Sequence, residues 1–259
     1  MIAHRLRKLA NFAGRYASAL AYATHTFTLG LRSPSRRAVI SRLARDAGYA
    51  EYPRPELPLV GIDAISRDTT DVQLPFPEGS EGNVSLLELL VLCRVVRERA
   101  PVQLFEIGTF DGRSTAALAA NAPAGAVVNT LDLPPDHPTR FPVVGRERAF
   151  IDKPMSGARI AGSARAGSVR QLYGDSATYD FSPHRADFVF IDGSHQYEYV
   201  LSDSRRVLPM LMPGRSIVFW HDYGEWEGVT RALNELRAVD SRFSGLRHVR
   251  GTTLAFLEV

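Results

Sequence analysis

The feature that most constrains this chain is an alternation of apolar runs with helical segments between residues 102 and 222. Five runs of seven or eight residues read as buried strands: VQLFEIG (102–108), AVVNTLDL (126–133), VRQLYGD (169–175), ADFVFIDG (186–193) and SIVFWHD (216–222). Strands that are apolar almost throughout must be covered on both faces. The pattern therefore predicts a parallel sheet between two layers of helices.

Helical patterns lie between the predicted strands. We expect helices at 84–100, 113–122, 197–211 and 228–238, the first capped by Asn83 or Ser85. Two closing strands, GLRHVRG and TTLAFLEV, predict an antiparallel hairpin at the sheet edge. The expected fold class is α/β, a Rossmann-like doubly wound and mostly parallel sheet of seven strands. It carries the antiparallel C-terminal hairpin and an N-terminal helical extension.

The N-terminal region has a composition of its own. Residues 1–45 hold nine Lys/Arg and no Asp/Glu, which leaves the rest of the chain with a net charge of −6. Two or three helical pieces are expected over residues 1–50, broken near Gly30 to Pro34. Three interpretations stay open: accessory helices of the folded protein, a helix that contacts a membrane surface or a second subunit, and a processed leader.

The expected domain organisation has two parts. Residues 1–84 form a basic helical arm and an irregular connector, because 51–84 is rich in Pro, Gly and Asp. Residues 85–259 form the α/β domain. Within it, segment 134–168 lacks the expected crossover helix and holds four prolines up to Pro142. A loop of this length indicates a lid, an interface or a mobile segment.

Composition excludes several classes of protein. Cys93 is the only cysteine, so neither a disulfide nor a cysteine zinc site forms within the chain. No run of about 18 apolar residues is present, so no transmembrane helix is expected. The mildly acidic catalytic part disfavours a nucleic-acid partner. We expect a cytoplasmic protein, with a membrane-peripheral or targeted location left open by the basic arm, and allow for a homo-oligomer.

Polar residues follow the strand ends. In open parallel sheets, ligands bind at the carboxyl ends of the strands, where strand order reverses. Gly108 and Gly112 follow the first strand, Asp132 ends the second, and Asp175-Ser176 end the third. A carboxylate at the second strand end accepts hydrogen bonds from the ribose of an adenosine. The loop GTFDGRS lacks the G-x-G-x-x-G spacing of nicotinamide dehydrogenases, which disfavours that class.

With these motifs, Leu86 to Val259 resembles the class I S-adenosylmethionine (SAM)-dependent methyltransferases. The resemblance is strongest to the small-molecule O-methyltransferase branch, which includes bacterial natural-product and sugar enzymes. The motifs are EIGTFDGRST, a strand-end acid, GDS, FIDGSH and a late HD. Phe110 departs from the family pattern, where glycine is common, and Arg215 replaces the second glycine of a Pro-Gly-Gly turn. The resemblance implies a SAM site that comprises Glu106, Gly108, Thr109, Gly112, Ser114, Asp132, Asp175 and Ser176.

A second group of residues predicts a metal site. Asp192 ends the fourth strand, and His221 and Asp222 end the fifth, about 4.8 Å away if the strands are neighbours. Two carboxylates so close repel unless a cation or a proton lies between them. A divalent metal fulfils this role, and the resemblance implies magnesium held at these positions. His221 is either a third ligand or a second base, and its imidazole leaves manganese or iron open.

His195 follows the fourth strand and is the expected general base, because a neutral imidazole can take a hydroxyl proton. The predicted function is methyl transfer from SAM to a hydroxyl of a small molecule of the sugar, phenol or natural-product type. Lack of an Asn-Pro-Pro-Tyr element favours oxygen over nitrogen. A metal-dependent hydrolase and a non-catalytic SAM-binding relative remain as alternatives. Five aromatic residues either wall the acceptor pocket or pack in the core: Tyr197, Tyr199, Trp220, Tyr223 and Trp226.

Overall fold

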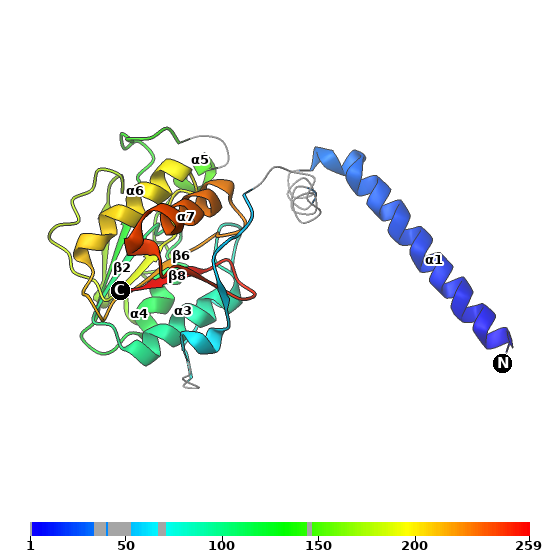
Figure 1. The fold of residues 1–259 in the computed structure, drawn as a ribbon, viewed down its shortest axis with the longest axis horizontal. Coiled ribbons are helices and arrows are strands. Elements are labelled where there is room, and N and C mark those ends of the chain that lie inside the picture. Colours follow the sequence, from blue (N-terminus) through cyan, green and yellow to red (C-terminus); the bar gives the residue numbers. More distant parts are fainter. Residues whose placement is uncertain (1, 34–39, 41–52, 67–70, 144–146) are drawn as a thin grey trace. The chain divides into compact units, whose positions relative to one another are not determined.

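The computed structural model describes residues 2–33, 40, 53–66, 71–143 and 147–259. Contacts divide the chain into two compact units, Met1–Tyr52 and Pro53–Val259. The first contains α1 (Ile2–Phe27) and a 3-10 turn η1 (Leu29–Arg32), shown in Figure 1. Except for Ile40, the helical pieces expected from residue 34 to residue 50 lie outside the described residues. Among the described helices, none is both long enough and apolar enough to cross a membrane.

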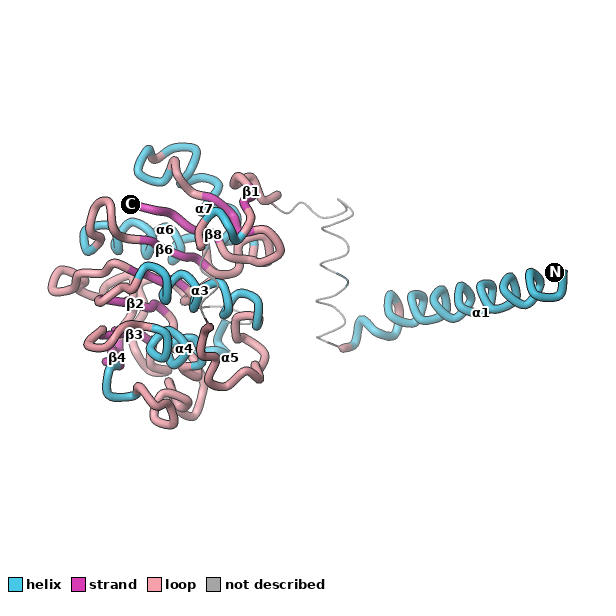
Figure 2. The backbone as a smooth tube through the Cα atoms, turned by 90° about the horizontal axis from the view of Figure 1, so that it is seen from below, coloured by secondary structure: helices cyan, strands magenta, loops and turns pink. Residues whose placement is uncertain are grey.

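The second unit is built on one eight-stranded sheet with the order β1-β7-β8-β6-β5-β2-β3-β4, which Figure 2 shows from β1 to β4. All pairs are parallel except β6–β8 and β7–β8. The seven strands expected from the sequence are present: β2 (Gln103–Ile107), β3 (Val127–Asp132), β4 (Val169–Tyr173), β5 (Phe188–Ile191), β6 (Ile217–Trp220), β7 (Arg247–Val249) and β8 (Ala255–Glu258).

The sheet has one strand more than expected. β1 (Leu59–Val60) comes from the connector and pairs in parallel with β7. Two residues are too short to give a strand signal in the sequence, so only the contact with β7 defines this strand. As a result, β7 is not an edge strand, and the C-terminal hairpin lies inside the sheet.

Helices cover both faces of the sheet, as the apolar strands require. The helices α3 (Leu86–Arg99) and α4 (Arg113–Asn121) lie on one side and α6 (Tyr197–Val207) and α7 (Glu227–Val239) on the other (Figure 1). Successive strand residues point to opposite faces. Accordingly, Leu104 joins the buried cluster with α3 and α4, whereas Phe105 joins the cluster with α6 and α7.

The winding of the chain places a switch point between β2 and β5. From β2 the chain runs outward through β3 and β4, then returns to β5 on the other side of β2 and continues to β6. Ile107 pairs with Ile191, and Ile191 pairs with Trp220. The next residues along the three strands, Gly108, Asp192 and His221, therefore leave the sheet side by side at its carboxyl edge.

The start of α3 is fixed by a capping box. The Ser85 hydroxyl accepts a hydrogen bond from the Glu88 backbone N–H at 3.3 Å, and the Glu88 carboxylate accepts one from the Ser85 N–H at 2.8 Å. This reciprocal pair satisfies two donors at the helix start. Of the two candidate caps, Ser85 is therefore the one used. Asn83 instead accepts from the Ser80 N–H and donates to Asp111.

The connector before α3 is anchored by a buried arginine. Arg113, the first residue of α4, is 2% exposed and donates to the carbonyl oxygens of Phe76, Val84 and Pro77 at 2.8–2.9 Å. Its planar guanidinium has enough donors to hold all three carbonyls at once. The irregular connector is thus tied to the start of the helix that follows the glycine loop.

Candidate active site

The loop after β2 depends on glycine at two positions. Gly108 has φ +98°, and a Cβ there would lie 2.0 Å from the Asp192 carbonyl oxygen. Gly112 has φ +85°, and a Cβ there would lie 2.6 Å from the Ile160 side chain. Only glycine combines these backbone angles with such close approach. The two glycines therefore let β5 and segment 157–160 pack directly against the loop.

Glu106 lies beneath this loop and is fully buried. Its Oε2 accepts hydrogen bonds from the hydroxyls of Thr115 and, at 2.7 Å, Thr130. Burial raises the pKa of Glu106 to about 7, although nearby hydroxyls, including that of Ser114, offset part of the effect. Thr109 lies in the same network, with its hydroxyl 2.8 Å from that of Thr130. These predicted SAM-site residues are in one place, but Glu106 and Thr109 are covered.

Asp132 ends β3 at the same edge, where it contacts a residue that the sequence did not single out. Its Oδ2 lies 2.7 Å from Lys153 Nζ, and both side chains are about nine-tenths buried, at 9% and 12% exposed. The other oxygen accepts a long hydrogen bond, 3.4 Å, from the Phe110 N–H. Lys153 thus already occupies one of the oxygens expected to bind a ribose.

Asp175 and Ser176 follow β4. The Asp175 carboxylate accepts from the backbone N–H groups of Arg140 at 2.7 Å and Ala177 at 3.0 Å. The Ser176 carbonyl accepts from Arg206 Nε at 3.2 Å. Asp175 therefore links the end of β4 to the segment after β3, and its carboxylate is buried, at 2% exposed.

The long segment 134–168 packs over the glycine loop. The Gly157 N–H donates to the Phe110 carbonyl at 2.8 Å, and the Arg159 N–H donates to the Asp111 carbonyl at 2.9 Å. Phe110, at φ +49°, packs its ring edge against Phe150 in this segment, with centroids 5.9 Å apart. The segment contains the short helix α5 (Arg148–Ile151) and covers the place where the sequence predicts SAM.

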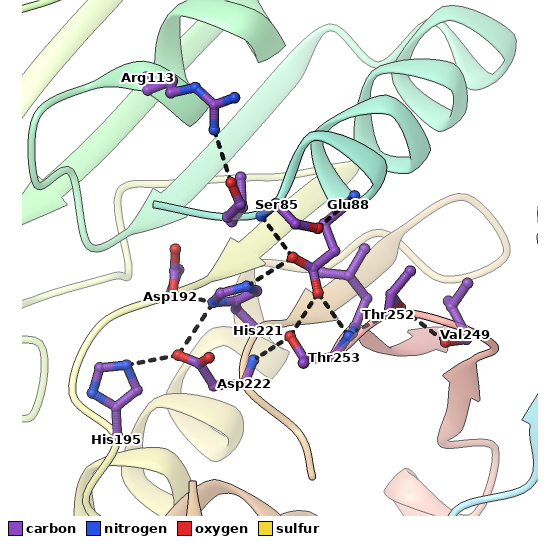
Figure 3. A network of polar contacts seen from close by, with 12 residues as sticks. Ser85, Glu88, Arg113, Asp192, His195, His221, Asp222, Val249, Thr252 and Thr253 are labelled. Carbon is purple, nitrogen blue, oxygen red and sulfur yellow. Dashed lines mark hydrogen bonds and ion pairs between the residues drawn. The ribbon is translucent and has the colours of Figure 1, made fainter. Parts of the chain in front are cut away.

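Asp192, His221 and Asp222 form a compact cluster at the ends of β5 and β6 (Figure 3). One ligand atom of each lies within 4.8 Å of the others. His221 Nδ1 lies 3.0 Å from Asp192 Oδ1 and 3.2 Å from Asp222 Oδ2. A cavity of about 10 Å³ adjoins all three residues, which is room for about one water molecule. The predicted metal residues are therefore brought together.

The backbone at this cluster is strained. Asp222 has φ +65°, a conformation that a residue with a side chain rarely adopts. Its N–H donates to the Thr253 hydroxyl at 3.2 Å. Such conformations cost on the order of 1–3 kcal/mol and persist only where the surroundings enforce them. Here the strained turn aims the Asp222 carboxylate at His221 and His195.

The ring of His221 is held from its other side by Glu88, which the sequence analysis missed. Glu88 Oε2 lies 3.3 Å from His221 Nε2, and Oε1 accepts from both the N–H and the hydroxyl of Thr253 at 2.7 Å (Figure 3). Glu88 lies in the first turn of α3, where the sequence pattern indicates only a capping residue. Its second role depends on the packing of α3 beside β6.

These contacts set the charges of the cluster. The carboxylates of Asp192 and Asp222 hold the pKa of His221 well above its usual value, despite burial. Burial opposes ionisation of Asp222, but His221 and His195 outweigh it and lower its pKa. The pKa of Asp192 is raised, chiefly by burial. In the described state His221 is therefore a cation that neutralises the carboxylates around it.

His195 lies between two carboxylates. Its Nε2 is 2.7 Å from Asp222 Oδ2, its Nδ1 is 3.3 Å from Glu147 Oε1, and its ring stacks on Trp226 with centroids 4.1 Å apart. Burial lowers the pKa of His195, but hydrogen bonds to Asp222 and Glu147 outweigh it and raise the pKa to about 9. The expected neutral imidazole near pH 7 thus differs from the described state, in which His195 carries its proton.

Glu147 is a further residue that the sequence analysis missed. Its carboxylate accepts hydrogen bonds from the backbone N–H of His195 at 2.5 Å, from the Ser194 hydroxyl at 2.9 Å and from Gln196 Nε2 at 2.7 Å. Glu147 lies in the long segment, where no pattern marked it. It fixes the turn that presents His195, because all three contacts hold residues of that turn.

Some of the aromatic residues singled out in the sequence pack in the core, and one lies at the candidate site. Trp220 and Tyr223 are buried, and their polar atoms bond to Ser204 and to the Glu56 and Leu57 N–H groups respectively. Tyr199 is also buried. These three pack in the core. Trp226, only partly buried, stacks on His195, and Phe150 lies edge-on to the same ring.

Comparison with known families bears directly on this site. Residues 105–223 match a family model described as a methyltransferase domain. The match begins in β2 and ends one residue after Asp222, so the matched segment contains every residue predicted for the SAM and metal sites. It also contains Glu147 and Lys153, whereas Glu88 lies before it.

Solved structures similar to this chain include several methyltransferases. The O-methyltransferase TomG from Streptomyces achromogenes, in complex with SAM, is 20% identical, with 67% of this chain and 79% of that chain covered and a TM-score of 0.46. The SAH-bound methyltransferase PaMTH1 from Podospora anserina is 17% identical, with coverage of 69% and 80% and a TM-score of 0.49. A comparison with curated proteins finds no match.

Proposed function

We propose that this protein transfers a methyl group from SAM to a hydroxyl group of a small molecule. The observation that carries the proposal is the meeting of two residue sets on one sheet edge. Asp132 ends β3 on one side of the switch point, and the Asp192–His221–Asp222 cluster lies on the other. The match to a methyltransferase domain supports this assignment. TomG, a structure similar to this chain, is named as an O-methyltransferase, the class of activity that we propose here.

In this proposal, SAM lies across the ends of β2, β3 and β4. SAM supplies a methyl group activated by its sulfonium charge. Asp132 binds the ribose hydroxyls, because a strand-end carboxylate is the usual acceptor for that diol. Gly108 and Gly112 allow the backbone of the loop to approach the ligand closely. Ser114, Asp175 and Ser176 complete the predicted SAM site, and the covered Glu106 and Thr109 support the loop from beneath.

The cluster of Asp192, His221 and Asp222 fits a divalent metal. Two carboxylates and one imidazole nitrogen converge within 4.8 Å, and oxygen-rich donor sets suit Mg²⁺ or Mn²⁺. His221 Nδ1 faces both carboxylates, so its lone pair has the direction that ligation requires once the proton has left. A metal bound there would orient the acceptor hydroxyl and lower its pKa. We propose Mg²⁺ as the first candidate.

The protein's own groups would orient the acceptor and move its proton. Nε2 of His195 faces the cluster at 2.7 Å from Asp222 and is the atom that would receive the hydroxyl proton. Because Nε2 carries a proton that it donates to Asp222 in the described state, the ring must first lose this proton to solvent, and only the neutral ring can then accept the hydroxyl proton at Nε2. Trp226 and Glu147 hold the ring in place meanwhile. Most of the rate gain would come from alignment of the acceptor oxygen with the methyl group.

The test is calorimetric titration of the full chain with SAM, with and without Mg²⁺. A methyl-transfer screen over sugars, phenols and polyketide-like hydroxyls would follow. We expect SAM to bind and at least one hydroxyl acceptor to gain a methyl group. Hydrolysis of esters or phosphates that ignores SAM would instead indicate a metal-dependent hydrolase. SAM binding without transfer to any acceptor, and with no effect of metal, would indicate a non-catalytic relative.

A further inference from the structure

We propose that Glu88 is a positioning residue of the metal site, which sets the tautomer of His221. The inference rests on the proposed function, since it assumes that Asp192, His221 and Asp222 hold a metal. Glu88 does not touch the metal position itself. It contacts the far nitrogen of the ligand ring, Nε2, at 3.3 Å, while Nδ1 faces the two aspartates (Figure 3).

The geometry gives each nitrogen of His221 a different task. A carboxylate oxygen accepts hydrogen bonds and cannot donate them when it is ionised. Glu88 therefore keeps the proton of the neutral ring on Nε2 and leaves the lone pair on Nδ1, which points to Asp192 and Asp222. Metal-binding histidines commonly donate their other N–H to a carboxylate in this way, which fixes both the tautomer and the ring orientation.

Glu88 is itself held in one orientation. Oε1 accepts two hydrogen bonds from Thr253, through its N–H and its hydroxyl, both at 2.7 Å. Oε2 accepts from the Ser85 N–H at 2.8 Å and faces His221. The side chain is 4% exposed, so water does not compete for these contacts. Three donors from two chain segments thus point the second oxygen at the imidazole.

Glu88→Gln is the decisive substitution. Thr253 presents two donors to Oε1 and Ser85 presents one to Oε2, so the glutamine carbonyl should replace Oε1 and its amide nitrogen should replace Oε2, with loss of the Ser85 contact. That nitrogen would donate to Nε2, force the ring proton onto Nδ1 and direct it at the metal position. We expect Mn²⁺, used as the probe, to bind about 10- to 100-fold more weakly by calorimetry. SAM affinity should be unchanged, since Glu88 lies outside that site.

Ser85→Ala is the matched control. It removes the other half of the capping box and weakens the start of α3, but leaves the carboxylate on His221. Its Mn²⁺ affinity should stay within about threefold of wild type. Equal Mn²⁺ affinity of Glu88→Gln and wild type, or an equal loss in Ser85→Ala, would overturn the inference. A wild-type protein that binds no Mn²⁺ overturns the metal site itself. If Glu88→Gln does not fold, Glu88→Asp, which withdraws the carboxylate from the ring, should weaken Mn²⁺ binding.

A separate observation concerns α1, for which we infer an anionic membrane surface as partner. The sequence of α1 repeats an apolar residue at alternating spacings of four and three, as one helix face requires: Ile2, Leu6, Leu9, Ala13, Tyr16, Leu20, Ala23 and Phe27. The large side chains of this face that are described are exposed, Tyr16 by 65%, Leu20 by 57% and Phe27 by 49%, and Ala23 is partly exposed.

Charge decides between an anionic surface and a second copy of the helix. Residues 1–45 hold nine Lys/Arg and no Asp/Glu, so two copies of this region would bring together only positive charges. Paired helices normally use acidic partners for such charges. A cationic helix with an apolar face instead suits anionic lipid, where the face inserts and the cations contact headgroups.

Co-sedimentation of the full chain with vesicles tests this inference. We expect binding to phosphatidylcholine vesicles that contain phosphatidylglycerol, and at least tenfold weaker binding to phosphatidylcholine alone. Leu20→Gln with Phe27→Gln should reduce binding about tenfold or more. Tyr22→Gln should leave it near wild type, because Tyr22 is exposed but lies about 200° around the helix from Leu20. Equal binding to both vesicle types, an unchanged double variant, or a wild-type dimer that the double variant loses would each overturn the inference.

Discussion

The contact between Lys153 and Asp132 predicts that removal of a stabilising ion pair will strengthen cofactor binding. Lys153 Nζ lies 2.7 Å from Asp132 Oδ2, the carboxylate proposed to bind the ribose of SAM. SAM must therefore displace Lys153 before it can use that oxygen. Lys153→Met keeps the length and apolar stem of the side chain but removes the competing charge. We expect lower stability and higher SAM affinity in the same variant.

The structure sets the expected size of both effects. At 2.7 Å and an effective dielectric of about 20, the Coulomb attraction is roughly 6 kcal/mol. Desolvation and ordering of the lysine offset most of it, since a buried lysine loses about 2 kcal/mol of rotamer freedom. A net contribution of about 2 kcal/mol leaves about one molecule in thirty open to SAM. The apparent Kd of wild type should then exceed that of Lys153→Met by about 10- to 30-fold.

Calorimetric titration with SAM measures the affinity. Urea unfolding of the SAM-free protein measures the stability. Arg148→Ala is the matched control, because it breaks an ion pair in the same segment, with Asp152, that is about half exposed. Such a pair contributes at most about 1 kcal/mol, so SAM affinity should stay at the wild-type value. A Lys153→Met protein that is less stable but binds SAM no more tightly would refute the reasoning. Lys153 would then not compete with SAM for Asp132.

Three further predictions concern single residues. Asp132→Ala should weaken SAM binding in calorimetry, and an affinity equal to wild type would show that the cofactor is misplaced. His195→Ala should slow methyl transfer to an acceptor found in the screen while SAM affinity stays nearly unchanged. Burial, with a contribution from the Asp175 charge, raises the pKa of Asp203 to about 7. The folded protein therefore keeps a proton there that the unfolded chain loses near pH 4, so stability should fall from about pH 4 to pH 7 and then level off. Asp203→Asn should make that slope shallower, leaving the share of Glu106, whose pKa is also raised to about 7, and should add up to about 4 kcal/mol of unfolding free energy at pH 8. An unchanged slope in urea unfolding would contradict this prediction.

The sequence predicted the sheet well because its signals are local. The inner parallel strands β2, β3, β5 and β6 are largely apolar runs, and burial on both faces leaves little else that such a run can form. The edge strand β4 is only partly buried. The same logic predicted that the residues after Ile191 and Trp220 would meet, since neighbouring parallel strands end at one edge. Strand β1 was not predicted, because two residues carry no periodic signal. Only pairing with β7 makes Leu59–Val60 a strand.

Some residues of the candidate site could likewise be predicted from the sequence, and others could not. Asp192, His221 and Asp222 could be named in advance because each follows directly from a strand end. Glu88 could not, because its place in a capping box explains it completely until α3 packs beside β6. Glu147 and Lys153 lie in a segment without periodicity, and their contacts join residues 21 to 49 positions apart in the chain.

By itself, the sequence determined which edge of the sheet carries the chemistry and which acids and histidines stand there. The position of each strand end follows from the local pattern of apolar residues, which can be read directly from the sequence. The tertiary structure alone decided the charge state of those groups. Glu88 and Glu147 come from outside the strands to contact His221 and His195, and Lys153 comes from the long segment to neutralise Asp132. Electrostatic interactions depend on distance and burial in space, which no order of residues along the chain specifies.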